Sequence, residues 1–261
     1  MNQMIRNIQQ NTGMGFDNTS HAGGSERDEL VPSRYALRVG EIDVMVISDG
    51  VVTPPAESMA TNADPAVRGA WLDDMFLPHD AFDWALNEVV VRSGDQTILI
   101  DSGIGHEYPN FPRAGQLGAR LAAAGIDLAS VTDVVLTPMH FDHVGALMEF
   151  PGRRVFVHEI ELDQPYAGMW SGLMETVEVI KLSGDEGEFE PGLRWMLTPG
   201  HAEGLITLLV DTDAGLVAIP SDCVGPMPEY FDNMDLPKDF PNRETLLEQW
   251  RKIRDLEPAL I

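Results

Sequence analysis

The sequence is poor in cysteine and in basic residues. Its 261 residues include a single cysteine, Cys223, which excludes an internal disulfide and a cysteine-based zinc cluster. Lysine and arginine number 17 against 42 aspartates and glutamates, so the formal net charge is −25 at pH 7. Because nucleic acids and anionic membranes are bound through basic surfaces, this balance argues against both as partners.

Long apolar runs are missing as well. No stretch approaches the roughly 18 consecutive apolar residues that a membrane-spanning helix requires, and the N-terminal segment lacks the apolar block of a secretory signal. Together with the lone thiol, these absences lead us to expect a cytoplasmic protein. The hydrophobic content of 44% is that of a globular protein, and the acidic balance favours a metal cation as a ligand.

The chain divides into a polar start and one long globular region. Residues 1–30 carry few large apolar side chains, so we expect a flexible tail. Residues 31–261 contain no convincing linker and are expected to form a single domain. Alternating or buried apolar patterns predict strands. The predicted strands lie near residues 35–40, 41–49, 87–93, 96–101, 131–138, 153–159, 176–182, 193–198, 205–210 and 216–219.

Helical patterns are fewer. A helix is expected from Leu117 to a stop at Gly125, and another near the C-terminus with Asn242 as its N-cap. The Pro-broken stretch 51–79 looks too irregular for one regular element. Strands followed by helices, twice over, indicate an α/β protein with sheets inside and helices outside.

Four segments place metal-type ligands after predicted strands. The segment TPMHFDHVG holds two histidines and an aspartate within four positions, and TPGHAEG, IPSDC and ILIDSGIG each add one such residue. Imidazole and carboxylate are typical ligands of Zn²⁺, Mn²⁺ and Fe²⁺. The candidate residues are His140, Asp142, His143, His201, Asp222 and Asp101.

In this order, the segments resemble the metallo-β-lactamase-fold hydrolases, in particular the branch of acyl-homoserine-lactone lactonases and methyl-parathion-hydrolase-like enzymes. The resemblance runs from about Tyr35 to the C-terminus and includes SDG at 48–50. It implies a four-layer αββα sandwich with a metal site at one edge of the paired sheets. It further implies that His140 and His201 hold a first metal, Asp142 and His143 a second, and Asp222 both, while Asp101 orients the ligands through hydrogen bonds.

Two departures from the family pattern HxHxDH bear on this site. Its first histidine falls on Pro138, whose side chain has no donor atom. The family also has a late histidine, which would follow Ile261, so we expect either a longer native chain or a missing ligand. One divalent ion is therefore expected rather than two, with zinc favoured over manganese or iron.

The expected function is that of a metallohydrolase. A metal-activated water would attack a small-molecule lactone, ester or related electrophile, with Asp142 as a metal ligand or as the group that moves the proton. The alternative is a metal-poor binding or scaffolding domain of the same fold. A homo-oligomer is compatible with the sequence. His158 is expected to be structural, His79 and His106 to lie in loops, and Cys223 to be a buried apolar group.

Overall fold

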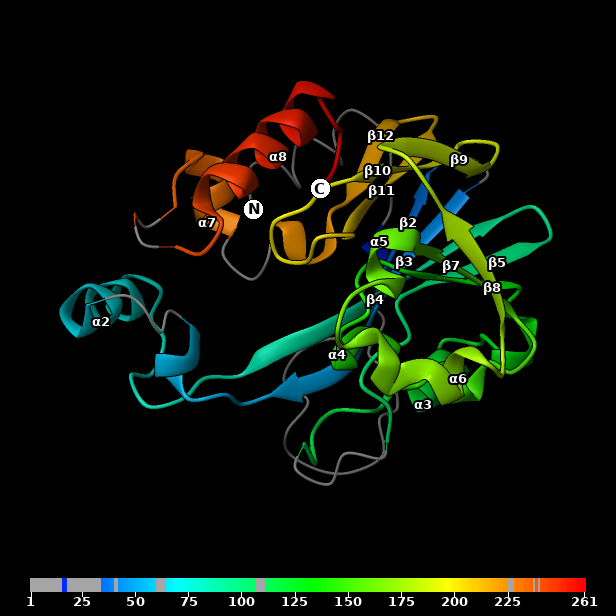
Figure 1. Cartoon of the computed structure of the whole chain (residues 1–261), viewed down its shortest axis with the longest axis horizontal. Coiled ribbons are helices and arrows are strands. Elements are labelled where there is room, and N and C mark those ends of the chain that lie inside the picture. The colour runs from blue at the N-terminus through cyan, green and yellow to red at the C-terminus, as the bar shows by residue number, and fades with distance from the viewer. Residues whose placement is uncertain are drawn as a thin grey trace.

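The computed structural model describes residues 16–17, 34–39, 42–59, 64–106, 111–224, 228–236, 238 and 240–261. Two sheets lie face to face, and helices cover the outer face of each (Figure 1). This arrangement confirms the predicted αββα sandwich. The predicted tail lies mostly outside the described residues, although Phe16–Asp17 pairs with the first strand of the domain.

The larger sheet contains eight strands among the described residues. In spatial order they are β1 (Phe16–Asp17), β2 (Arg34–Val39), β3 (Ile42–Val52), β4 (Trp84–Ser93), β5 (Gln96–Ile100), β6 (Asp133–Leu136), β7 (Arg154–His158) and β8 (Glu178–Leu182). Strands β1 to β5 pair antiparallel, whereas β5 to β8 pair parallel. The carboxyl ends of β5, β6 and β7 therefore meet at one edge.

The smaller sheet is antiparallel. Its strands, in spatial order, are β12 (Gly215–Ile219), β11 (Ile206–Thr212), β10 (Leu193–Leu197) and β9 (Glu186–Glu190). Sequence patterning predicts β10 to β12 but misses β9. This edge strand reads EGEFE, and its charged residues hide the apolar alternation of a buried strand.

Alternation along each strand separates two cores. In β4, Val90 packs on the helices beneath the larger sheet, whereas Val91 faces the smaller sheet. In β6, Val134 and Val135 divide in the same way. This period-two pattern is what buries a sheet on both faces.

The outer layers consist of helices that bury one apolar face. Helix α3 (Leu117–Ala123) contributes Leu117 and Leu121 to the core beneath the larger sheet. Helix α8 (Arg243–Asp255) covers the smaller sheet with the predicted stripe of Leu246, Leu247, Trp250 and Ile253, all at most 5% exposed. The shorter helices are α4 (Phe141–Val144), α5 (Glu159–Leu162), α6 (Ser171–Met174) and α7 (Pro228–Asn233).

Two predictions outside the sheets gain detail from the structure. The stretch 51–79 is not one regular element, as expected: β3 continues to Val52, and α2 (Pro65–Asp74) forms a helix away from the sandwich (Figure 1). Asp64 caps α2 by accepting a hydrogen bond from the N–H of Ala66, and Pro65 sits in its first turn. Asn242 occupies the predicted N-cap position of α8, although its side chain makes no capping hydrogen bond.

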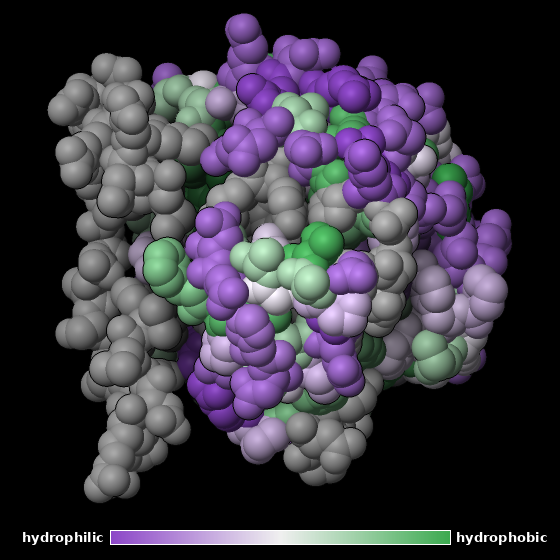
Figure 2. Space-filling view, turned by 90° about the vertical axis from the view of Figure 1, so that its left-hand side faces the viewer, coloured by the Kyte–Doolittle hydropathy of each residue, from purple (hydrophilic) through white to green (hydrophobic). Residues whose placement is uncertain are grey.

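Hydrophilic side chains dominate the described surface on the side of the molecule that carries α2 (Figure 2). Within the part of the chain described, no helix has both the length and the apolar character needed to cross a bilayer.

Candidate functional site

The candidate residues gather where the parallel strands end. Asp101 directly follows β5, and His140 follows β6 at the start of α4. His201 lies in the turn between β10 and β11, while Asp222 lies in the 3-10 helix η5 (Ser221–Cys223), just beyond β12. Both sheets thus contribute loops to one site. The larger sheet does so at the carboxyl ends of its parallel strands, where binding sites are common, and the smaller sheet does so through the loops that follow β10 and β12.

Three of these residues form a compact donor cluster. One donor atom each from His140, His201 and Asp222 lies within 4.8 Å of the other two. His201 Nε2 is 3.0 Å from His140 Nδ1 and 3.2 Å from Asp222 Oδ2. Two imidazoles and a carboxylate are a donor set suited to Zn²⁺ or Fe²⁺, and they leave coordination positions open. The residues present therefore fit one divalent ion.

His143 lies beside this cluster, and each of its ring nitrogens contacts a carboxylate. Its Nδ1 lies 2.8 Å from Asp101 Oδ2, and its Nε2 lies 3.3 Å from Asp222 Oδ2. Asp142 is more distant, with Oδ1 3.8 Å from His143 Nε2. Asp142 and His143 consequently stand outside the compact three-residue group, although His143 contacts its carboxylate.

Asp101 is fixed on its other side by Thr137. The Thr137 N–H donates to Asp101 Oδ1 at 2.8 Å, and its hydroxyl donates to Oδ2 at 2.6 Å. The Thr137 hydroxyl also lies 2.7 Å from the Ser221 hydroxyl, next to Asp222 in the chain. Asp101 adopts a left-handed backbone with φ of 62°. Such a conformation in a non-glycine residue persists only where its surroundings hold it.

Charge interactions shift the pKa values of this group in opposite directions. Burial alone lowers the pKa of His143, but Asp101 and Asp222 outweigh it and raise that pKa well above 6.5. Burial alone raises the pKa of Asp222, but the hydrogen bond from His143 and the neighbouring imidazoles lower it to about 2. The pKa of His140 is lowered by burial and by its two histidine neighbours.

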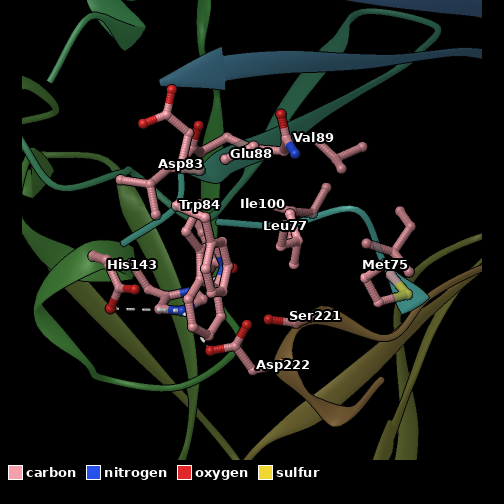
Figure 3. A pocket seen from close by; sticks show the side chains of 17 residues that line it. Met75, Leu77, Asp83, Trp84, Glu88, Val89, Ile100, His143, Ser221 and Asp222 are labelled. Atoms are coloured by element: carbon pink, nitrogen blue, oxygen red, sulfur yellow. Dashed lines mark hydrogen bonds and ion pairs between the residues drawn. The ribbon is translucent and has the colours of Figure 1, made fainter. Parts of the chain in front are cut away.

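Two cavities, each of about 470 Å³, open on this cluster. The first includes Asp101, Asp142, His143 and Asp222 in its lining, and Figure 3 shows His143, Asp222 and Trp84 around it. The second is walled mostly by apolar groups. Its lining includes Val52, Phe111, Phe141, Tyr166, Met169 and Trp170. Trp84, Leu86, Asp142 and Asp222 line both cavities, and no lysine or arginine is among the lining residues that the structure describes.

Two buried carboxyl groups near the site escape sequence reasoning. Glu88 in β4 lines the first cavity, and burial together with the charges of Asp49 and Asp101 raises its pKa well above 4.5. Glu161 in α5 is fully buried and accepts hydrogen bonds from the N–H groups of Met139 and Gly204. The signal for Glu161 was its place in the first turn of the short helix that follows a buried strand, which runs parallel to the strand before His140.

The other histidines that the structure describes lie away from the cluster. His158 is 1% exposed, and its ring lies at hydrogen-bond distance from Gly184 O and the N–H of Ile160, which is a structural role. His79 and His106 are exposed and lie beside Asp73 and Glu149, respectively. The remaining candidate, Cys223, is buried, and burial raises the pKa of its thiol to about 12.

The chain belongs to the metallo-beta-lactamase superfamily, because the profile of that family matches residues 85–261. This membership confirms the family resemblance of the motifs. A search of curated proteins found no match.

Several solved structures have a fold similar to that of this chain. The dizinc quorum-quenching lactonase AidC aligns with a TM-score of 0.69 at 19% identity, over 84% of this chain and 85% of its own. The hydrolase AbOPH of the beta-lactamase superfamily aligns with a TM-score of 0.66 at 18% identity, over 86% of each chain. A probable metal-dependent hydrolase from Staphylococcus aureus gives 0.67 at 15% identity, over 83% of this chain and 85% of its own. At these identities the likeness establishes the fold.

Proposed function

We propose that this chain is a metal-dependent hydrolase of small neutral esters or lactones. The observation that carries the proposal is the convergence of His140, His201 and Asp222 within 4.8 Å, beside two cavities. A divalent ion bound there, zinc by preference, would supply Lewis-acid chemistry that acidifies water and stabilises a developing oxyanion. The lactonase and hydrolases with similar folds are consistent with this reaction class.

A single ion is the occupancy that we propose. Pro138 stands two positions before His140, where the family pattern has a ligand histidine, and it offers no donor atom. Asp142 and His143 lie outside the compact donor group. The hydrogen bond between His143 and Asp101 orients the His143 ring toward Asp222, so His143 needs no metal ion to hold this position.

Asp142 is the residue that we propose moves the proton. Its side chain is 26% exposed and lines both cavities, so it can reach a water molecule and a substrate together. A carboxylate in this place accepts a proton from the attacking water and returns it to the leaving oxygen. Asp101 and Thr137 keep His143 oriented, and His143 in turn holds Asp222.

The cavities support a neutral substrate with an apolar portion. The second cavity is walled mainly by aromatic and aliphatic side chains, which favour apolar groups. The described linings of both cavities hold no lysine or arginine, and the carboxylates of Asp142 and Asp222 line both of them, which favours a neutral substrate over an anionic one.

The test combines elemental analysis with hydrolysis assays. The purified protein is expected to carry one equivalent of metal and to hydrolyse members of a lactone and ester panel, with turnover lost on chelation and restored by Zn²⁺. His201→Ala should lose both metal and turnover. His79→Ala is the matched control, because it removes an exposed imidazole on a different part of the surface. Chelator-insensitive turnover would overturn the proposal.

Pro138 also favours a second candidate, a metal-poor binding domain. The same analysis separates the two, because that candidate predicts no stoichiometric metal after expression with zinc. A Pro138→His variant restores the missing imidazole and is expected to bind additional metal. A wild-type protein without metal, together with a Pro138→His variant without metal, would favour the binding domain.

A further inference from the structure

A buried carboxylate links the two loops that carry His140 and His201. Glu161 is 0% exposed, in α5 directly after β7. Its Oε2 accepts a hydrogen bond from the N–H of Met139 at 2.8 Å, and its Oε1 accepts one from the N–H of Gly204 at 2.9 Å. Charge-assisted hydrogen bonds of this kind are needed to keep an ionised carboxylate inside a protein.

The two donors belong to the loops that bear the imidazoles. Met139 is the residue before His140, and Gly204 lies three residues after His201. The loops come from different sheets, since His140 follows β6 and His201 follows β10. One carboxylate therefore holds the backbones of both loops at a fixed separation, and the two rings lie 3.0 Å apart between their nearest nitrogens.

The same carboxylate also anchors the wall of the site. Tyr166 donates its hydroxyl hydrogen to Glu161 Oε2 at 2.9 Å, and its ring packs edge-on against His140 with 5.2 Å between centroids. Trp170 adds a bond from Nε1 to the carbonyl of Met139 at 2.8 Å. His140 is thus bounded by a ring whose position depends on Glu161.

Gly204 explains how the backbone comes so close to the carboxylate. A Cβ at position 204 would lie 2.8 Å from both Cγ and the backbone nitrogen of Glu161. Atoms in real structures avoid such contacts, so only glycine fits at this position without displacement. Residues 161 and 204 therefore form one packed unit between the two loops.

We propose that Glu161 is a positioning residue that sets the separation of His140 and His201 and thereby the affinity of the site for its ion. The inference rests on the proposed metal-dependent function. Glu161 acts through the backbones of the two loops and touches neither the ion nor the substrate. Removal of such a supporting partner costs about 10- to 100-fold in metal affinity.

Glu161→Gln is the variant that tests this role. The amide keeps the size of the side chain but replaces one acceptor with an N–H₂ donor, so one of the two backbone N–H groups faces a donor. We expect Zn²⁺ affinity, measured by competition with a chromophoric chelator, to fall about 10- to 100-fold. Tyr166→Phe, which removes a single donor and keeps the ring, should give a smaller loss.

Asp49→Asn is the matched control for stability. Asp49 is also fully buried and also accepts two backbone hydrogen bonds, from Ile104 at 2.9 Å and Leu117 at 2.7 Å. Neither donor lies in the loops of His140 or His201. Asp49→Asn should lower the thermal stability of the metal-free protein, as Glu161→Gln does, but leave Zn²⁺ affinity within about twofold. Equal Zn²⁺ losses in the two variants would overturn the positioning role.

A metal-free measurement separates this inference from the proposed function. In protein with ¹⁵N-labelled histidine, the paired rings of His140 and His201 should give spectra that change in Glu161→Gln and stay as in wild type in Asp49→Asn. A wild-type protein that binds no Zn²⁺ would refute the hydrolase proposal, and the histidine spectra would still decide the role of Glu161. Unchanged spectra in Glu161→Gln would refute that role.

Discussion

His143 and His201 reach the same carboxylate, but the protein holds them in different ways. The His143 side chain is 12% exposed, and Asp101 holds its ring directly. The His201 side chain is 40% exposed, and its loop is held through the backbone, by Glu161 at Gly204 and by Asn242 at Gly200. An imidazole can therefore be oriented through its own ring nitrogen or through the chain on either side of it.

The comparison indicates which property of each histidine a substitution should change. A bond to the ring fixes the tautomer and the charge of the imidazole, so its loss changes pKa as well as position. A bond to the loop fixes position alone. Changes on the His143 side should thus alter protonation, whereas changes on the His201 side should alter geometry and stability.

Asp222→Asn should have the largest effect, because both histidines contact Asp222 Oδ2, at 3.3 Å and 3.2 Å. An amide is a poor metal ligand, so we expect Zn²⁺ affinity and turnover to fall by more than about 100-fold. Chelator competition and a lactone assay measure the two losses. If Zn²⁺ affinity and turnover both stayed within about threefold of wild type, Asp222 would not be the residue that links His143 to His201.

Asp101→Asn should come next, and its effect on the metal site should pass through His143. Loss of the carboxylate removes the interaction that raises the pKa of His143, so that pKa should fall. Metal affinity should drop about 10- to 100-fold. Histidine NMR titration and Zn²⁺ competition test this pair of effects. A fall in affinity without a change in the pKa of His143 would contradict the distinction between ring support and loop support.

The pH dependence of metal-free stability follows from the same contrast. The pKa of His143 is raised in the folded state. Its contribution to the free energy of unfolding is therefore complete below pH 6.5 and is lost as pH rises through the folded-state pKa. The pKa of Asp222 is about 2 in the folded state and 3.8 in an ordinary aspartate. Asp222 therefore adds about 2 kcal/mol to the free energy of unfolding above pH 3.8, and this contribution is lost as pH falls toward 2.

Chemical denaturation at a series of pH values tests this profile. The metal-free protein should be most stable in the weakly acidic range. His143→Gln should flatten the decline on the alkaline side, because it removes the group that loses its proton there. His201→Gln serves as the control, and an equal flattening in both variants would show that the decline does not arise from His143.

Asn242→Gly should have the smallest effect. The Asn242 side chain donates to the carbonyl of Gly200 at 2.7 Å, and its backbone is left-handed with φ of 53°. Glycine accepts that backbone, so the variant removes only the hydrogen bond, at about 1 kcal/mol. Asn242→Ala should cost about 1 kcal/mol more, because alanine is strained there. Thermal unfolding measures both, and equal losses would show that backbone strain contributes nothing.

Much of the fold was accessible from the sequence because its signals are local. Period-two alternation predicted the strands at the core, and glycine at position 125 marked the end of α3, where φ is 77°. The start of α2 also had a local signal, Asp64 before Pro65, but the surrounding prolines concealed it. The charged strand β9 gave no apolar pattern from which to infer pairing.

The residues of the site likewise divide into those that the sequence predicts and those that it does not. The motif residues could be expected to converge because they follow strands whose ends meet, and His140, His201 and Asp222 do lie together. The supports could not be predicted, because their partners are distant in sequence. Glu161 meets Gly204 across 43 positions, and Asn242 meets Gly200 across 42. Asn242 carries the signature of a helix cap, which conceals its contact with another loop.

The contact between Gly204 and Glu161 also limits how this protein can diverge. Because a Cβ at position 204 would meet the backbone nitrogen of Glu161 as well as its side chain, a shorter residue at 161 does not by itself make room. Any mutational route that replaces Gly204 must first shift the start of α5, so Gly204 is expected to persist among descendants of this sequence even where residue 161 changes.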